Sequence, residues 1–151
     1  MQHRIRAAGI VIDRDRILMV NENEGGQSYW VPPGGGFEAQ DGNTSNTVKR
    51  EVWEESGLTV SVGPLLFVRE FFETSKNIYH VEQFYWVGSW SGDLTLKNLE
   101  FSSGDERSIS DVRWMTRQEL SVIKVFPPQL RDLLWDKLAA GDQSIVHLGY
   151  G

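Results

Sequence analysis

The stretch from Trp30 to Leu58 decides the fold and reads WVPPGGGFEAQDGNTSNTVKREVWEESGL. Its glycine-rich turn leads into a polar linker and then into a segment with helical periodicity. Thr44 or Ser45 is the expected helix N-cap, because their hydroxyls can accept from the first free N–H groups. Gly57 is expected to end the helix, since glycine suits the left-handed residue found there.

Three glutamates give this helix its chemical interest. Glu51, Glu54 and Glu55 are spaced i, i+3 and i+4, so their carboxylates project from neighbouring positions on one side. Val48 and Val52 form an apolar stripe that the carboxylates border. Three solvated anions at this distance repel one another. A hard divalent cation would reverse the sign of the interaction, because Mg²⁺ prefers oxygen ligands.

The combination of turn and helix is more specific than either part. An acidic helix alone is usually a solvated surface, and a run of glycines alone is usually a turn. Together, Pro-Gly-Gly-Gly-x-Glu and the later Arg-Glu-apolar-x-Glu-Glu-x-Gly-apolar resemble the Nudix box of the Nudix hydrolases. The spacing departs from that box by one extra residue before Arg50, and Asp41 stands in place of its first glutamate. We expect a turn within residues 41–46 to absorb the extra residue without shifting the helix register.

The resemblance covers Trp30–Leu58 and implies an α+β fold, the Nudix-type α/β/α sandwich with a mixed β-sheet flanked by helices. Residues 1–151 are expected to form a single Nudix domain, a length that suits one hydrophobic core. Alternation and turn residues predict strands at residues 3–12, 17–20, 30–31, 58–62, 65–72, 81–90 and 112–115, with residues 21–27 as a polar loop. Thr116 with Glu119 predicts a capped helix to Leu120, and a terminal helix runs to about Ala140.

The resemblance also implies the site. Glu51, Glu54 and Glu55 would be ligands of Mg²⁺ or Mn²⁺, joined by the backbone carbonyl of Gly35 or a neighbouring glycine. Glu51, Glu54 and Arg50 would form the catalytic set, with Arg50 orienting a carboxylate such as Glu54.

The general base is open between Glu54 and a late-loop residue, for which Glu100, Asp105 and Glu106 are available. The alternative is that these three loop carboxylates are ordinary solvent-exposed charges without a catalytic role. Arg69 and Glu38 are candidates for contacting substrate. Arg69 could grip a phosphate or face solvent, and Glu38 could be an outer metal ligand or a partner of Arg50.

Composition excludes several classes. The chain has no cysteine, which rules out disulfides, zinc thiolate sites and cysteine nucleophiles. The net charge of −6 argues against a nucleic-acid polymer as partner, although a phosphorylated small molecule remains compatible with a bound metal. No signal-like or membrane-length apolar run is present, so a cytoplasmic protein without membrane contact is expected.

The expected function is metal-dependent hydrolysis of a pyrophosphate bond in a nucleoside diphosphate linked to another moiety. The alternative is a non-catalytic ligand-binding or sensing Nudix domain, suggested by the altered spacing at Asp41. The partner in either case is a nucleotide-like phosphorylated small molecule. Motifs that mark particular Nudix substrates are absent, so the substrate is not named. A homodimer is a further expectation, since the exposed edges of a small sheet can pair.

Overall fold

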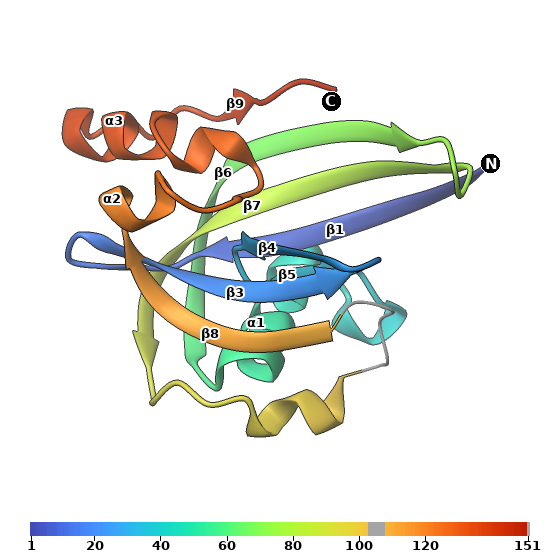
Figure 1. Ribbon diagram of the computed structural model, residues 1–151, viewed down its shortest axis with the longest axis horizontal. Helices are drawn as coiled ribbons and strands as arrows, with labels where there is room; N and C mark the ends of the chain where they lie inside the picture. The colour runs from blue at the N-terminus through green and yellow to red at the C-terminus, as the bar shows by residue number, and fades with distance from the viewer. Residues whose placement is uncertain (103–107, 151) are drawn as a thin grey trace.

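The computed structural model describes residues 1–102 and 108–150, and its centre is a mixed five-stranded sheet (Figure 1). The strand order is β5-β1-β7-β6-β9. Strand β1 runs parallel to β7 and antiparallel to β5, while β6 runs antiparallel to β7. The bounds are β1 (Gln2–Ile10), β5 (Gly34–Gly36), β6 (Thr59–Glu73), β7 (Ile78–Ser91) and β9 (Val146–His147).

A second sheet of four strands is built around β3, which pairs with each of the other three strands. Its members are β2 (Ile12–Asp13), β3 (Arg16–Glu24), β4 (Gln27–Val31) and β8 (Ser108–Thr116). The short connection from β4 to β5 carries Pro32 and Pro33, which lack the N–H that a sheet ladder needs. The chain therefore leaves one sheet and enters the other at this point.

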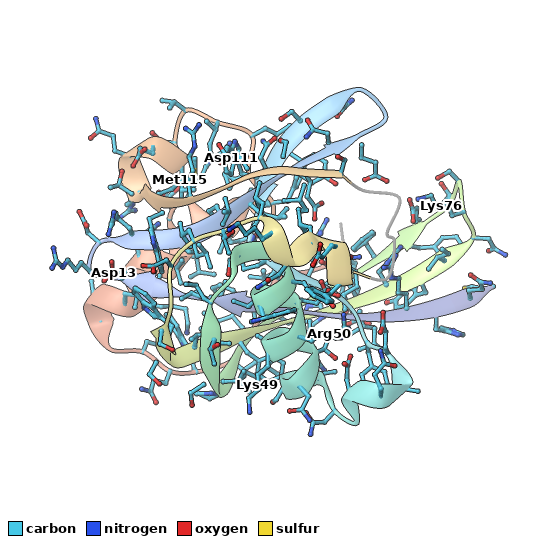
Figure 2. The ribbon with its side chains drawn as sticks, turned by 90° about the horizontal axis from the view of Figure 1, so that it is seen from below. Asp13, Lys49, Arg50, Lys76, Asp111 and Met115 are labelled. Atoms are coloured by element: carbon cyan, nitrogen blue, oxygen red, sulfur yellow. The ribbon has the colours of Figure 1, made fainter. Side chains whose placement is uncertain are left out.

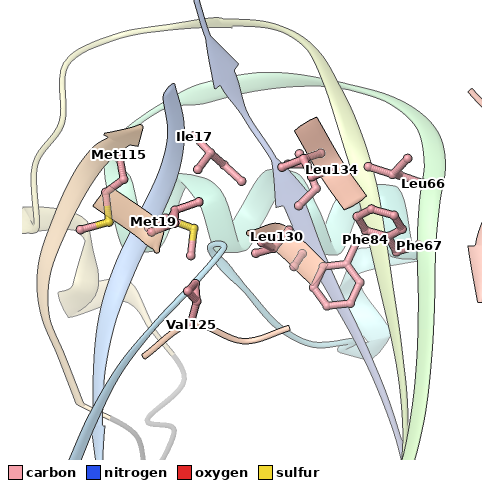
Figure 3. Close-up of a cluster of buried hydrophobic side chains, with 12 residues drawn as sticks. Ile17, Met19, Leu66, Phe67, Phe84, Met115, Val125, Leu130 and Leu134 are labelled. Carbon is pink, nitrogen blue, oxygen red and sulfur yellow. The ribbon is translucent and has the colours of Figure 1, made fainter. Parts of the chain in front are cut away.

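The helices form two hydrophobic cores on opposite sides of β1. Helix α1 (Thr44–Ser56) buries Val48 and Val52 against Ala7 and other residues of one face. The alternate β1 residues, such as Ala8, belong to the other core, which also contains Leu130 and Leu134. Figure 3 shows this second core. These two leucines come from η3 (Pro128–Leu130) and α3 (Leu133–Ala140). Side chains of successive strand residues point to opposite faces, so β1 separates the cores, and the predicted α/β/α arrangement is confirmed.

Helix α1 has the register that the sequence predicts. Val48 and Val52 are fully buried, and Gly57 closes the helix with a φ of 83°. The N-cap prediction is wrong by one residue: Asn43 caps the helix, and its side chain accepts from the backbone N–H of Asn46. The extra residue is absorbed before the helix, by η1 (Ala39–Asp41) and a turn at Gly42.

The strand predictions differ from the structure at three places. Residues 58–62 and 65–72 belong to one long strand, β6, because register shifts between Ser61 and Phe67 carry the ladder past Gly63 and Pro64. The predicted loop at residues 21–27 is mostly strand, with its reversal at Gly25 and Gly26. The glycine turn at residues 34–36 is itself the edge strand β5.

The end of the chain follows the prediction in part. Helix α2 (Arg117–Leu120) has the predicted capping box of Thr116 and Glu119. The terminal helix is divided, with η3 preceding α3, and α3 ends at Ala140 as expected. A further 3-10 segment, η2 (Lys97–Phe101), follows β7. No helix within residues 1–102 and 108–150 is long and apolar enough to cross a membrane.

Candidate active site

The three glutamates of α1 are buried where the helix meets β5. Glu51, Glu54 and Glu55 are 9%, 5% and 7% exposed, so they are not the solvated acidic face of an ordinary surface helix. A carboxylate oxygen of Glu55 accepts a 2.8 Å hydrogen bond from the backbone N–H of Gly34. Burying carboxylates is costly unless each is paired or bound to a cation, so this cluster needs positive partners.

Gly35 makes the approach of helix and strand possible. A Cβ atom built on Gly35 would lie 2.5 Å from Oε1 of Glu51 and 2.6 Å from its Cδ. The Glu51 carboxylate therefore fills the space that any other residue would use at Gly35. The predicted proximity of Gly35 to the glutamates is confirmed, and its role as a ligand stays a prediction.

Arg50 projects from α1 (Figure 2) and contacts several parts of the site. Its guanidinium donates to Oε1 of Glu51 at 2.8 Å and to the carbonyl of Gly36 at 3.0 Å, with a longer 3.5 Å contact to Glu54. Its neighbour Lys49 is exposed. The expected orienting role of Arg50 fits this geometry, although Glu51 is held more closely than Glu54.

Asp41 is the principal partner of Arg50. Its two carboxylate oxygens accept from Nε and Nη2 of Arg50 at 2.7 and 2.9 Å, a bidentate pair. The Oδ2 atom of Asp41 also accepts from the hydroxyl of Thr47 and from the backbone N–H of Glu38. The Arg50 guanidinium and these donors lower the pKa of Asp41 to about 2. Asp41 thus anchors Arg50 from the position where the box carries its first glutamate.

The electrostatics fit a cation site. Burial, followed by repulsion from Glu51, raises the pKa of Glu54 to about 7, against the lowering effect of Arg50. Within residues 1–102 and 108–150, no group of three His, Cys, Asp or Glu side chains is already arranged around a single metal position. To share one metal ion, Glu51 would have to release Arg50, or Glu55 would have to release the N–H of Gly34. The donor set of three carboxylates beside a side-chain-free strand suits a hard divalent cation.

Glu51 and Glu55 open onto a cleft of about 1130 Å³, whose described lining does not include Glu54 or Arg50. The strands β1, β6 and β7 supply one wall, and β3, β4 and the segment 124–127 supply the other. Glu51, Glu55 and the three glycines of β5 lie in its lining, as do the two substrate-contact candidates, Arg69 and Glu38. Arg69 pairs with Glu82 at 2.8 Å. Glu38 begins η1, accepts from the side chain of Gln40 and lies 3.9 Å from Arg50.

The late-loop candidates for the general base divide into two groups. Glu100 is exposed on η2 and is not among the residues that line the cleft. Asp105 and Glu106 fall outside the described residues. Glu54 is likewise absent from that lining, but it belongs to the buried carboxylate cluster and lies 3.5 Å from Arg50, so it is the base candidate that we retain.

Sequence reasoning missed two carboxylates in the cleft. Glu22, on β3, is 1% exposed. The Tyr29 hydroxyl interacts with the carboxylates of Glu22 and Glu24. Burial, followed by these two carboxylates, raises the pKa of Tyr29. Glu82 lies on β7 between two arginines. The polar composition of residues 21–27 concealed the strand that buries Glu22. The alternation of β7 was the available signal for Glu82, since residues 80, 82 and 84 share a face.

A mixed sheet between two helical layers, with buried carboxylates against a glycine strand in a large cleft, defines a candidate hydrolase of phosphorylated small molecules. The NUDIX domain family model matches residues 3–135. The chain therefore belongs to the Nudix family, and it is a Nudix hydrolase that acts on phosphoric anhydride bonds.

Individual relatives agree with this assignment. A MutT-like protein of Streptomyces ambofaciens is 30% identical over 138 residues, covering 87% of this chain and 77% of that protein. The solution structure of the E. coli ORF135 protein has a TM-score of 0.70 at 21% identity, covering 93% of this chain and 94% of that one. An ADP-ribose pyrophosphatase from Streptococcus suis has a TM-score of 0.64 at 16% identity, covering 95% and 98%. The two structural likenesses show the fold.

Proposed function

We propose that the protein uses Mg²⁺ or Mn²⁺ to hydrolyse a pyrophosphate bond in a nucleoside diphosphate linked to another moiety. The observation that carries this proposal is the burial of Glu51, Glu54 and Glu55 beside the glycine strand, with Arg50 among them. Three carboxylates buried this close together on one helix are costly if the helix is only structural. They are useful for binding a cation and, through it, phosphate oxygens.

The glutamates of α1 and the carbonyl of Gly35 would hold the metal. A divalent cation in such a site neutralises phosphate charge and lowers the pKa of water. The chain supplies the geometry: Arg50 fixes the Glu51 carboxylate at 2.8 Å, and Asp41 fixes Arg50 in turn. Glu54 is the residue we assign to accept the proton of the attacking water. The cleft walls would orient the phosphate chain relative to the metal.

The geometry at Asp41 supports the catalytic proposal over the alternative of a non-catalytic sensing domain. That alternative rested on the altered spacing at Asp41, and that spacing is absorbed at η1 and Gly42 while Asp41 keeps the contact to Arg50. The ADP-ribose pyrophosphatase of Streptococcus suis supports a substrate with a nucleoside diphosphate portion. The cytoplasmic location and the homodimer remain predictions from the sequence.

A substrate panel tests the proposal. The purified protein is incubated with Mg²⁺ or Mn²⁺ and nucleoside triphosphates, nucleotide sugars, ADP-ribose or dinucleotides, and the products are resolved by anion-exchange chromatography. We expect metal-dependent appearance of nucleoside monophosphate or pyrophosphate from at least one class, abolished by EDTA. Saturable binding of a nucleotide without turnover under any of these conditions would instead establish the sensing domain.

A further inference from the structure

A row of side chains crosses the floor of the cleft, starting at the glycine strand. In the sheet register Gly36 of β5 lies opposite Arg6 of β1, Arg6 opposite Glu82 of β7, and Glu82 opposite Arg69 of β6. Residues opposite one another in a sheet share a face, and neighbouring strands are about 4.8 Å apart. Arg6, Glu82 and Arg69 therefore form a continuous triad beside the glycine strand.

Glu82 connects the two arginines. Its Oε1 lies 2.8 Å from Nη1 of Arg69, and its Oε2 lies 3.6 Å from Nε of Arg6. The side chains of Arg6, Glu82 and Arg69 are 11%, 17% and 17% exposed, and all three line the cleft. One carboxylate thus lies between two guanidinium groups in a partly dehydrated setting, where electrostatic attraction is stronger than in water.

The neighbouring row of the sheet, formed by Phe71 and His80, holds Arg69 in place. The Arg69 guanidinium lies 4.4 Å from the ring centre of Phe71, which stacks on the His80 ring at 4.5 Å. His80 is 5% exposed, and its Nε2 meets Glu73 at 3.0 Å. Its Nδ1 is buried without a hydrogen-bond partner among the described residues. The arginine is thus fixed by a carboxylate and by an aromatic face, which lowers the entropy it loses on binding a ligand.

The triad is also connected to the box. The carbonyl of Gly36 accepts from Arg50, and a Cβ on Gly36 would lie 3.2 Å from Nε and Nη2 of Arg4. Arg4 lies two residues from Arg6 on the same face of β1 and also lines the cleft. The other charged groups on this face, Glu73 and His80, face each other. Three arginines therefore line the floor of the cleft beyond the glycine strand, while Glu22 and Glu24 line its opposite wall.

We propose that Arg6 and Arg69, positioned by Glu82, bind a phosphate group of the substrate other than the pair joined by the cleaved bond. This inference rests on the proposed function, because it assigns a substrate class to the same cleft. Planar guanidinium groups bind phosphate through paired N–H donors. Substrates with an additional phosphate, such as nucleoside triphosphates, are therefore preferred over nucleotides that carry a neutral sugar.

Binding without metal separates this subsite from the chemistry. Titration calorimetry in EDTA measures the affinity for inorganic tripolyphosphate in wild type, Arg6→Gln and Arg69→Gln. Each substitution should weaken binding about tenfold, equivalent to ~1.4 kcal/mol. Arg113→Gln is the matched control, because Arg113 is an exposed arginine of β8 that pairs with Asp111 at 2.7 Å and is not among the residues that line the cleft. It removes the same charge and should leave the affinity unchanged.

Three results would overturn the proposal: wild-type affinity in both cleft variants, an equal loss in Arg113→Gln, or no binding of tripolyphosphate by wild type. Arg69→Lys provides a second variant if Arg69→Gln does not fold; it keeps the charge but loses the bidentate geometry, and should still bind more weakly. With Mg²⁺ present, Arg69→Gln should lower kcat/KM more for a nucleoside triphosphate than for a nucleotide sugar. Tripolyphosphate binding with no hydrolysis of any substrate would reject the proposed function and keep the subsite.

Discussion

Substituting Gly35 by alanine should separate the function of the site from the stability of the fold. The new Cβ would lie 2.5 Å from Oε1 of Glu51, 2.6 Å from its Cδ and 2.9 Å from its Oε2. Ordinary van der Waals contacts begin near 3.4 Å, so the Glu51 carboxylate must retreat by about 0.9 Å (3.4 minus 2.5). A displacement of ~1 Å at a catalytic constellation can lower the rate about a hundredfold. We expect kcat/KM with Mg²⁺ to fall by roughly that factor.

The same substitution should change stability little. The atoms that Cβ meets belong to the end of a flexible side chain, and turning that side chain away costs ~1 kcal/mol. Replacing glycine by alanine returns up to ~1 kcal/mol by restricting the unfolded chain. The melting temperature in EDTA should therefore stay within about 4 °C of wild type.

Two other glycines provide controls. Gly34→Ala should unfold the protein or strongly destabilise it, because its Cβ would lie 2.6 Å from the backbone carbonyl of Ala7, which cannot rotate away. Gly88→Ala should be neutral for stability and activity, since its nearest contact is 3.7 Å. Parental kcat/KM in a folded Gly35→Ala protein would refute the argument that Glu51 must stay against Gly35.

Three further predictions concern metal, acid and the turn. Millimolar Mg²⁺ or Mn²⁺ should raise the melting temperature, since a ligand at 100 times its Kd adds ~2.7 kcal/mol to the folded state; no shift in differential scanning fluorimetry would count against the metal site. Asp41 has a pKa of about 2, below its ordinary value, so its stabilisation is present above pH ~4 and lost toward pH ~2. The difference in unfolding free energy between wild type and Asp41→Asn, from urea titrations, should therefore shrink over that range, and a constant difference would contradict the charge pairing with Arg50. Gly42→Ala should cost ~1–2 kcal/mol, because Gly42 has a φ of 78°, while an unchanged urea midpoint would show that the turn tolerates a side chain.

Sequence periodicity predicted the parts of the site that lie on one element. The helix register and the burial of Val48 and Val52 follow from local spacing, whereas the approach of the glutamates to the glycine strand was expected from the resemblance to the Nudix box. Local spacing did not predict the main partner of Arg50. Asp41 contacts Arg50 from a separate turn, and the spacing of the box does not determine how far that turn lies from the helix. Local pattern identifies residues on one face, whereas pairing between elements depends on tertiary geometry.

The cleft shows the same limit more strongly. Glu22 lies in a segment whose composition favours a loop, and only pairing with β4 and β8 makes it a buried strand residue. Arg69 could be identified as a charged residue in an apolar strand. Its alignment with Glu82 and Arg6 depends on the register of three strands, one of them parallel to its neighbour. No sequence spacing encodes that register, since the connecting segments set it.

The most direct test of the central claim compares wild type with Glu54→Gln on the best substrate of the panel. Glu54 is buried with a pKa raised to about 7, so its charge destabilises the folded protein above that pH and the neutral amide should keep or raise the melting temperature in EDTA. The account predicts a loss in kcat on the order of a hundredfold or more, comparable to removing a preorganised electrostatic group, while Glu119→Gln on α2 retains the parental rate. A folded Glu54→Gln protein that hydrolyses substrate at the wild-type rate would contradict it.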